Sequence, residues 1–247
     1  MADERDRFVT GVSLGRWQTN CYVIGDRGRG AAFVVDPGEN GATEVPRVLD
    51  EHGVTCEAIL LTHGHLDHLW AVPALAEELD VPVFLHPGDG WLWDDPFAGF
   101  GMDISPDDAE QFLGAPWQPP TERLQDLSDD QRLTFAGVEI RANHTPGHTP
   151  GHVTFLAAGL SGAQVHLDEP VDVARSGILV SGDLLFRGSV GRTDFPRGSW
   201  EEQMESLARV VVPLDDGVVV LPGHGPATTV ERERDSNPFL AEVVSGR

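Results

Sequence analysis

The chain has 247 residues, of which 40% are hydrophobic, enough for a sizeable core in one large domain or two small ones. Its net charge is −23 and its 17 basic residues are all arginine, which excludes lysine Schiff-base chemistry and disfavours a nucleic-acid partner. No apolar run approaches the roughly 18 residues of a membrane span, and the opening MADERDRFVT is charged throughout, so we expect a cytoplasmic protein without membrane contact.

The first third of the chain is predicted to alternate strands with helices. Short apolar runs between turn residues indicate strands. A helix over 41–53, closed by Gly53, and a second helix over about 66–79 are predicted between them. The strands predicted here span 7–14, 20–25, 31–35, 57–62 and 81–88.

Residues 89–120 change in composition to Trp, Phe, Pro, Gly and Asp, and no regular element is predicted there. So long a loop is typical of a lid or an interface. A polar excursion is expected over 159–177, and the whole of 1–247 is expected to form one domain, as a monomer or homodimer. The second half otherwise returns to strands, predicted over 138–144, 153–157, 178–182 and 218–221, with helices beginning at the capping-box patterns Ser199–Glu202 and Thr228–Glu231.

Three histidines and an aspartate fall within six positions of THGHLDH, residues 62–68, directly after a predicted strand. Imidazole and carboxylate are ligands that zinc, iron and manganese accept. His63 and His65 are two apart in extended chain, so both rings can share one ion. Asp67 and His68 begin the following helix and could hold a second ion. This density of ligands at a strand-to-helix junction predicts a metal site.

Two ligands are too few for an ion, so the remaining ligands must come from distant segments. Three loops, each following a predicted strand, contain suitable side chains. Polar residues placed repeatedly beyond strand ends indicate one site at a shared sheet edge. The candidates are His144, His148 and His152 in NHTPGHTPGH, Asp183 in SGD, and His224 in PGHG.

Together, THGHLDH, TPGHT, SGD and PGHG resemble the metallo-β-lactamase superfamily in the order and spacing of its glyoxalase II-like (hydroxyacylglutathione hydrolase-like) branch, over nearly the whole chain. The resemblance implies an α/β fold of the four-layer αββα sandwich type, with two metals at one sheet edge. It also implies that His63, His65 and His148 hold one ion, that Asp67, His68 and His224 hold the other, and that Asp183 bridges both.

The implied activity is metal-dependent hydrolysis of a small-molecule thioester, a hydroxyacyl-glutathione or related acyl-thiol. Two divalent ions, zinc first and iron or manganese as alternatives, can lower the pKa of a bridging water and polarise a carbonyl. Asp67 and Asp183 are accordingly the expected catalytic carboxylates. Arg187 and Arg192, the arginines nearest Asp183 in sequence, and His152 are the candidate substrate contacts, although Arg192 could instead pair with Asp194.

Other activities of the superfamily are open alternatives. A mononuclear iron persulfide dioxygenase is the main one, because GRTDF at 191–195 resembles a motif of those enzymes. A lactonase or other ester hydrolase is a further alternative, but Tyr22, in a strand, is the only tyrosine that could serve it. A β-lactamase would be expected to have cysteine in place of Asp183.

The remaining histidines and the cysteines are expected to be mainly structural. His144 and His86 each end a predicted strand and could support the ligands from behind or be purely structural. His52 and His166 are expected at the surface. The two thiols are expected to be buried, because Cys21 and Cys56 lie in apolar contexts without a CxxC pair.

Overall fold

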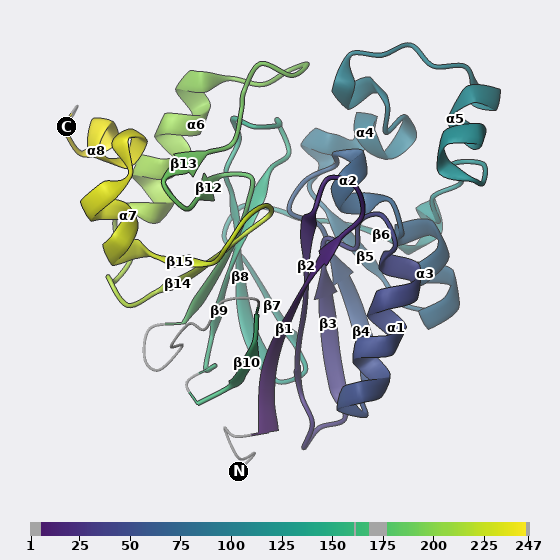
Figure 1. Cartoon of the computed structure of the whole chain (residues 1–247), viewed down its shortest axis with the longest axis horizontal. Helices are drawn as coiled ribbons and strands as arrows, with labels where there is room; N and C mark the ends of the chain where they lie inside the picture. The colour runs from purple at the N-terminus through teal and green to yellow at the C-terminus, as the bar shows by residue number, and fades with distance from the viewer. Residues whose placement is uncertain (1–5, 161, 168–176, 246–247) are drawn as a thin grey trace.

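The computed structural model describes residues 6–160, 162–167 and 177–245, and they form two β-sheets packed face to face (Figure 1). One sheet has the order β10 (Gln164–His166), β1 (Arg7–Leu14), β2 (Thr19–Asp26), β3 (Ala31–Val35), β4 (Thr55–Leu60), β5 (Val83–Leu85), β6 (Leu124–Asp126). The other has the order β15 (Thr228–Thr229), β14 (Val219–Pro222), β11 (Ile178–Gly182), β9 (Val153–Ala158), β8 (Val138–His144), β7 (Gln131–Phe135). A hairpin of β12 (Leu185–Phe186) and β13 (Ser189–Val190) stands apart.

Helices cover the outer face of each sheet. The first sheet is covered by α1 (Gly41–His52) and α3 (Val72–Leu79), and the second by α6 (Trp200–Ser206), its π-helical continuation η5 (Leu207–Val211), α7 (Val230–Ser236) and α8 (Pro238–Ser245) (Figure 1). Short helices lie near the site: α2 (Leu66–Leu69), η2 (Pro87–Asp89), α4 (Gly90–Asp94), η3 (Ala98–Phe100), α5 (Pro106–Leu113) and η4 (Thr121–Arg123).

Three buried clusters bind these layers together. Val48 of α1 packs with Val34 and Ile59 on the outer face of the first sheet. Strand residues alternate between faces, so the intervening Val35 and Leu60 join a second cluster between the sheets. A third cluster joins the second sheet to its helices, as in the packing of Leu179, Val220, Leu207, Val211 and Leu240. The layers are helix, sheet, sheet and helix, which confirms the predicted αββα sandwich.

The register brings the ends of four strands to one edge. In the first sheet β3 and β4 are parallel, with Val35 opposite Leu60. In the second sheet β11 and β14 are parallel, with Gly182 opposite Pro222. The carboxyl ends of parallel strands meet at the same edge of a sheet, so the loops that follow these strands meet there.

Several local predictions were wrong. The helix predicted over 66–79 is split into α2 and α3, because Pro73 has no N–H to continue the first helix and instead lies in the first turn of the second. Residues 89–120 contain the short helices α4, η3 and α5. The N-cap of α7 is Thr229, whose side chain accepts a hydrogen bond from the Arg232 amide. The predicted cap was Thr228, one residue earlier.

Two further elements depend on pairing with distant strands. Within the excursion 159–177, the described residues include β10, which pairs in parallel with β1, while residues 161 and 168–176 lie outside the described part. The prediction also missed β6 and β7, at sheet edges. Across the described ranges, no helix is both long and apolar enough to cross a membrane.

Candidate metal centre

Four loops at this shared edge supply seven converging side chains. The segment after β4 carries His63 and His65 in a loop and Asp67 and His68 on α2, and the loops after β8, β11 and β14 carry one residue each. Their potential ligand atoms fall into three overlapping groups, within each of which every atom lies within 4.8 Å of the others. The groups are His63, His65 and His148; His63, His68 and Asp183; and Asp67, His68 and His224.

The first group is a ring of three buried imidazoles. His65 Nδ1 lies 3.1 Å from His63 Nε2 and 2.9 Å from His148 Nε2. The outer nitrogen of His148 donates to the Arg192 carbonyl at 2.6 Å. The outer nitrogen of His63 lies 3.0 Å from Thr62 Oγ1, whose own hydroxyl donates to Asp36.

These outer bonds determine which inner nitrogens carry lone pairs. Because the Nδ1 atoms of His63 and His148 hold the protons, the Nε2 atoms of both neutral rings present lone pairs to His65. A proton on His65 Nδ1 could satisfy only one of them well. A cation would satisfy all three nitrogens, so this group fits a metal ion, as zinc sites with three histidines do.

The second metal-binding group is Asp67, His68 and His224, and the carboxylate of Asp183 lies beside it. Asp67 Oδ2 lies 3.2 Å from His224 Nε2 and 3.4 Å from His68 Nε2. His68 donates through Nδ1 to Asp36 at 3.0 Å, so in the neutral ring its Nε2 carries a lone pair that faces carboxylate oxygens. Neither His68 Nε2 nor Asp183 Oδ1 has a hydrogen-bond partner among the described residues, although both are buried. Such orphaned acceptors are costly unless a cation lies between them.

The electrostatics agree with this interpretation. Burial lowers the pKa of His68, but the carboxylates of Asp67, Asp183 and Asp36 outweigh it and raise that pKa to about 10. Burial also opposes ionisation of Asp67, yet His68 and His224 hold its pKa well below the usual range. The site therefore attracts positive charge strongly, and a divalent cation could take the place of the proton on His68.

Asp183 stands between the two groups. Its Oδ1 lies 3.5 Å from His68 Nε2, while its Oδ2 lies 3.5 Å from His148 Nε2 and 3.7 Å from His224 Nε2. Gly223 provides the room for this carboxylate, since a Cβ at that position would come within 2.2 Å of Asp183 Oδ1. The side chain can therefore contact both groups at once, and the geometry suits two ions.

Two buried aspartates that the sequence analysis missed hold the ligand loops. Asp36 accepts from Thr62 N at 2.8 Å and from Thr62 Oγ1 at 2.7 Å, as well as from His68. Its position directly after β3, on the edge where the ligand loops meet, was the signal in the sequence that could have found it.

Asp89, the second of them, accepts from Gly64 N at 2.9 Å, Thr149 Oγ1 at 2.7 Å and Gly151 N at 2.7 Å. It joins the loop of His63 and His65 to the loop of His148, so it aligns ligands that are distant in sequence. Burial raises the pKa of Asp89 despite these hydrogen bonds. Gly64 packs closely here, because a Cβ on it would lie 2.7 Å from Leu92 Cβ.

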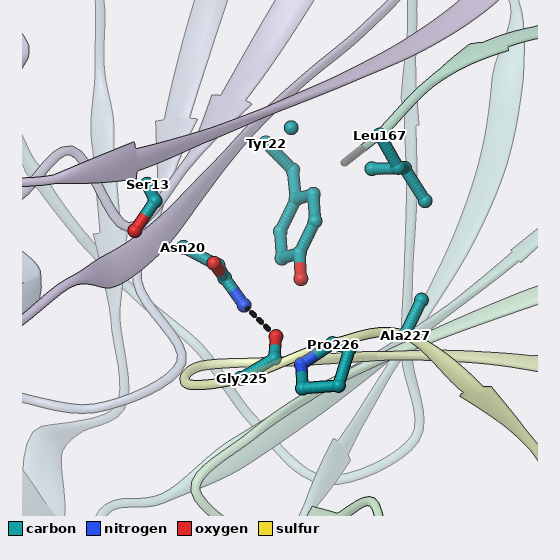
Figure 2. A pocket seen from close by; sticks show the side chains of 8 residues that line it. Ser13, Asn20, Tyr22, Leu167, Gly225, Pro226 and Ala227 are labelled. Carbon is teal, nitrogen blue, oxygen red and sulfur yellow. Dashed lines mark hydrogen bonds between the residues drawn. The ribbon is translucent and has the colours of Figure 1, made fainter. Parts of the chain in front are cut away.

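The His224 loop is held by the beginning of β2. Figure 2 shows the Asn20 side chain reaching the Gly225 carbonyl, at 2.7 Å, with Tyr22 beside it. Asn20 Nδ2 and the Tyr22 hydroxyl also donate to the Pro222 carbonyl, at 3.0 and 2.7 Å. The backbone of Asn20 donates to the Gly223 carbonyl at 2.7 Å. His224 is thus held on a loop braced on both sides.

The structure places the three predicted substrate contacts differently from one another. His152 is fully buried, and it accepts from the Asp183 amide at 3.0 Å and contacts Thr145 Oγ1 at 2.8 Å. A role facing the substrate does not fit this position, and His152 instead holds the backbone of Asp183. Arg187 donates to the Ala227 carbonyl at 3.1 Å. Arg192 lines the pocket and pairs with Asp194 at 2.6 Å, the alternative considered from the sequence.

The other histidines lie outside the cluster. His86 and His144 stack on each other with ring centroids 3.9 Å apart behind the third ligand loop, where His144 Nε2 contacts the Pro150 carbonyl at 2.8 Å. His166 is exposed as expected. His52 is only partly exposed, because it stacks on Phe8 at 3.7 Å and contacts Thr10 Oγ1.

A pocket of about 470 Å³ opens over the two groups. Its floor contains the ligands His65, Asp67, His148, Asp183 and His224. Its walls are largely apolar, formed by Trp17, Phe100, Phe186, Val190 and Phe195, with Ser189 and Arg192. Phe100 belongs to the segment 89–120, so that segment contributes to the pocket wall.

Comparison with known proteins agrees with the motif interpretation. The family model of the metallo-beta-lactamase superfamily matches residues 14–161. An uncharacterized protein of Mycobacterium leprae is 38% identical over 94% of this chain and 98% of its own length. The hydroxyacylglutathione hydrolase GloC of Haemophilus influenzae is 31% identical over 93% of this chain and 96% of its own.

Two solved structures are also similar. BLEG-1, described as a B3 metallo-beta-lactamase, superposes with a TM-score of 0.73 at 31% identity, covering 94% of this chain and 99% of that one. TTHA1623 in a di-iron-bound form superposes with a TM-score of 0.70 at 34% identity, covering 94% and 100%. With its fold, its ligand loops and these relatives in agreement, the chain belongs to the metallo-β-lactamase superfamily.

Proposed function

We propose that the protein is a binuclear metallohydrolase that cleaves small-molecule acyl thioesters. In this reaction a C–O bond forms between water and the acyl carbon, the C–S bond breaks, and the thiol leaves with a proton. The observation that carries the proposal is the position of Asp183, whose carboxylate lies 3.5 Å from His148 of the first group and 3.5 and 3.7 Å from His68 and His224 of the second.

The ligand roles follow from the two groups. His63, His65 and His148 would hold one ion, Asp67, His68 and His224 the other, and Asp183 would contact both. When bound, two divalent ions would supply a water of lowered pKa and a Lewis acid for the thioester carbonyl. Zinc is the first candidate, with iron and manganese as alternatives, because all three accept imidazole and carboxylate.

The protein itself orients the metal ligands and lines the pocket above them with apolar side chains. Hydrogen bonds from the outer nitrogens of His63, His68 and His148 hold each ring in the tautomer that keeps the inner nitrogen free. Asp67 receives a hydrogen bond from Thr19 Oγ1 at 2.9 Å, which fixes its carboxylate beside His224. A substrate held between the apolar walls would displace water from the site, which strengthens the electrostatic interactions of these groups.

Support for a thioester comes from the relative GloC, whose name states hydroxyacylglutathione hydrolysis and which aligns over 93% of this chain. Hydrolysis of a β-lactam is a second candidate, favoured by the 31% identity to BLEG-1, although Asp183 stands where cysteine was expected for that activity. Both reactions place water on a carbonyl carbon, so the same ligand set serves either one, and the leaving group distinguishes them.

The test is a substrate panel applied to the purified protein with its metals. We expect thiol release from S-lactoylglutathione or another acyl thioester, and loss of at least about a hundredfold in kcat/KM for His224→Ala. His166→Ala, which removes an exposed histidine outside the site, is the matched control. Oxygen uptake with glutathione persulfide would overturn the proposal in favour of a mononuclear iron dioxygenase. Cleavage of β-lactams without cleavage of any thioester would instead support β-lactam hydrolysis, the second candidate.

A further inference from the structure

The pocket over the metal centre has a continuous aromatic wall. The Trp17 and Phe100 rings stack with centroids 6.1 Å apart, and Phe195 meets Phe100 edge-on at 5.9 Å. Phe195 also contacts the ring of His65 edge-on at 5.5 Å. All three side chains are partly exposed into the pocket, and they come from three separate segments of the chain.

The pocket lining near His224 is also apolar. Phe186 of the β12–β13 hairpin lies with its ring centroid 6.1 Å from that of His224, beside the second group. Val190 of the same hairpin lines the pocket next to it. A substrate in the pocket would therefore meet apolar surface both near His65 and near His224.

The arginines in and next to the pocket already form ion pairs with carboxylates of the protein. Arg192 is the one cationic side chain lining it among the residues described, and its guanidinium bonds both carboxylate oxygens of Asp194, at 2.6 and 2.7 Å. The same guanidinium covers the Phe195 ring, with its carbon 4.0 Å from the centroid. Arg16, next to Trp17 in sequence, pairs with Glu39 at 2.7 Å.

These contacts are unsuited to a doubly carboxylated carrier such as glutathione. Recognition of a carboxylate normally uses an arginine that presents its fork of donors to the ligand. Here that fork is occupied, and the protein as a whole carries a net charge of −23, which repels anions. Apolar and aromatic surface is instead the usual means of binding an uncharged group.

We propose that the preferred substrates are uncharged thioesters with an aryl or bulky alkyl acyl group, held against the Trp17–Phe100–Phe195 wall. This inference rests on the proposed thioester hydrolysis and specifies its substrate class. Phe100 and Phe195 are then residues that determine specificity, since they contact the substrate without contributing to the ligand set.

The test crosses two acyl groups with two thiols. Lactoyl and phenylacetyl thioesters of glutathione and of N-acetylcysteamine, an uncharged thiol, give four substrates for the metal-loaded enzyme. We expect phenylacetyl-N-acetylcysteamine to have the highest kcat/KM, at least roughly tenfold above S-lactoylglutathione. Its kcat/KM should be nearly constant between about 0.05 and about 0.5 M NaCl, because no ion pair with the substrate is screened.

Substitutions in the aromatic wall test whether it causes the preference for the phenylacetyl group. Phe100→Ala should reduce the ratio of phenylacetyl to lactoyl kcat/KM by roughly tenfold, and Phe195→Leu, which keeps an apolar side chain, should reduce it less. Phe239→Ala, a partly exposed phenylalanine on α8, is the matched control and should leave the ratio unchanged. Calorimetric binding of the non-hydrolysable phenylethyl thioether of N-acetylcysteamine should weaken in parallel in the wall variants.

The outcomes separate the two proposals. S-lactoylglutathione as the best substrate, with a kcat/KM that falls as salt rises, would overturn the inference and leave thioester hydrolysis standing. An unchanged ratio in both wall variants would also overturn it. Failure of the metal-loaded enzyme to cleave any of the four thioesters would overturn the proposed function itself.

Discussion

Replacing Asp36 by asparagine tests how the structure prepares its ligands. Oδ2 of Asp36 accepts from both Thr62 Oγ1 and His68 Nδ1, at 2.7 and 3.0 Å. In Asp36→Asn an amide donor would take that position if the carbonyl stays on Thr62 N. Hydrogen bonds to a charged group contribute about 1.5 to 3 kcal/mol each, and Thr62 can reverse its hydroxyl, so we expect a loss of about 3 kcal/mol in unfolding free energy.

The effect on metal binding has a separate cause. Facing an amide donor, His68 would accept through Nδ1 and move its proton to Nε2, the atom that points into the second group. Changes to such outer partners lower metal affinity by roughly 10- to 100-fold. This corresponds to about 1.4 to 2.8 kcal/mol of binding free energy.

The assay pairs urea unfolding with competition against a chromophoric chelator. Asp26→Asn is the control, because Asp26 is equally buried and bonds the Arg29 amide at 3.1 Å, away from the ligand loops. We expect the control to lose stability without losing metal affinity. Wild-type affinity for both ions in Asp36→Asn would refute the tautomer argument.

Two other predictions concern the loop of His224 and the thiols. Asn20→Ala removes side-chain hydrogen bonds to Pro222 and Gly225, so the second ion should bind roughly tenfold more weakly in the same competition assay. Ser13→Ala, on β1 opposite Asn20 (Figure 2) but without a side-chain hydrogen bond to the described residues, should not change it. Burial raises the pKa of Cys56 to about 11 and that of Cys21 well above its usual value, so at pH 8 a thiol reagent should modify the native protein far more slowly than the urea-unfolded chain. A native thiol reacting at the unfolded rate would contradict this.

Most of what was predictable from the sequence lies close to strand ends. The strands at 7–14 and 31–35 have the bounds of β1 and β3, because their apolar runs are delimited by turn residues. The helix over 41–53 ends as expected, with Gly53 in the left-handed conformation at φ 66°. The four ligand motifs meet because each follows a strand whose end lies on the same edge.

What was not predictable depends on contacts between distant residues. Asp89 bonds residues 25 and 60 or more positions away, and nothing in its own sequence context indicates those partners. His152 resembles a ligand in sequence, and only its burial behind Asp183 shows that it supports the backbone. The helices within 89–120 are short and packed through Trp93 and Phe97, so they depend on tertiary contacts more than on local periodicity.

The central claim is that seven side chains from four loops hold two divalent ions, one on each side of Asp183. Elemental analysis of the purified protein, after equilibration with zinc and removal of unbound metal, tests it most directly. We predict two ions per chain, and one per chain in His224→Ala. A single ion in the wild-type protein, unaffected by the loss of His224, would contradict the binuclear centre.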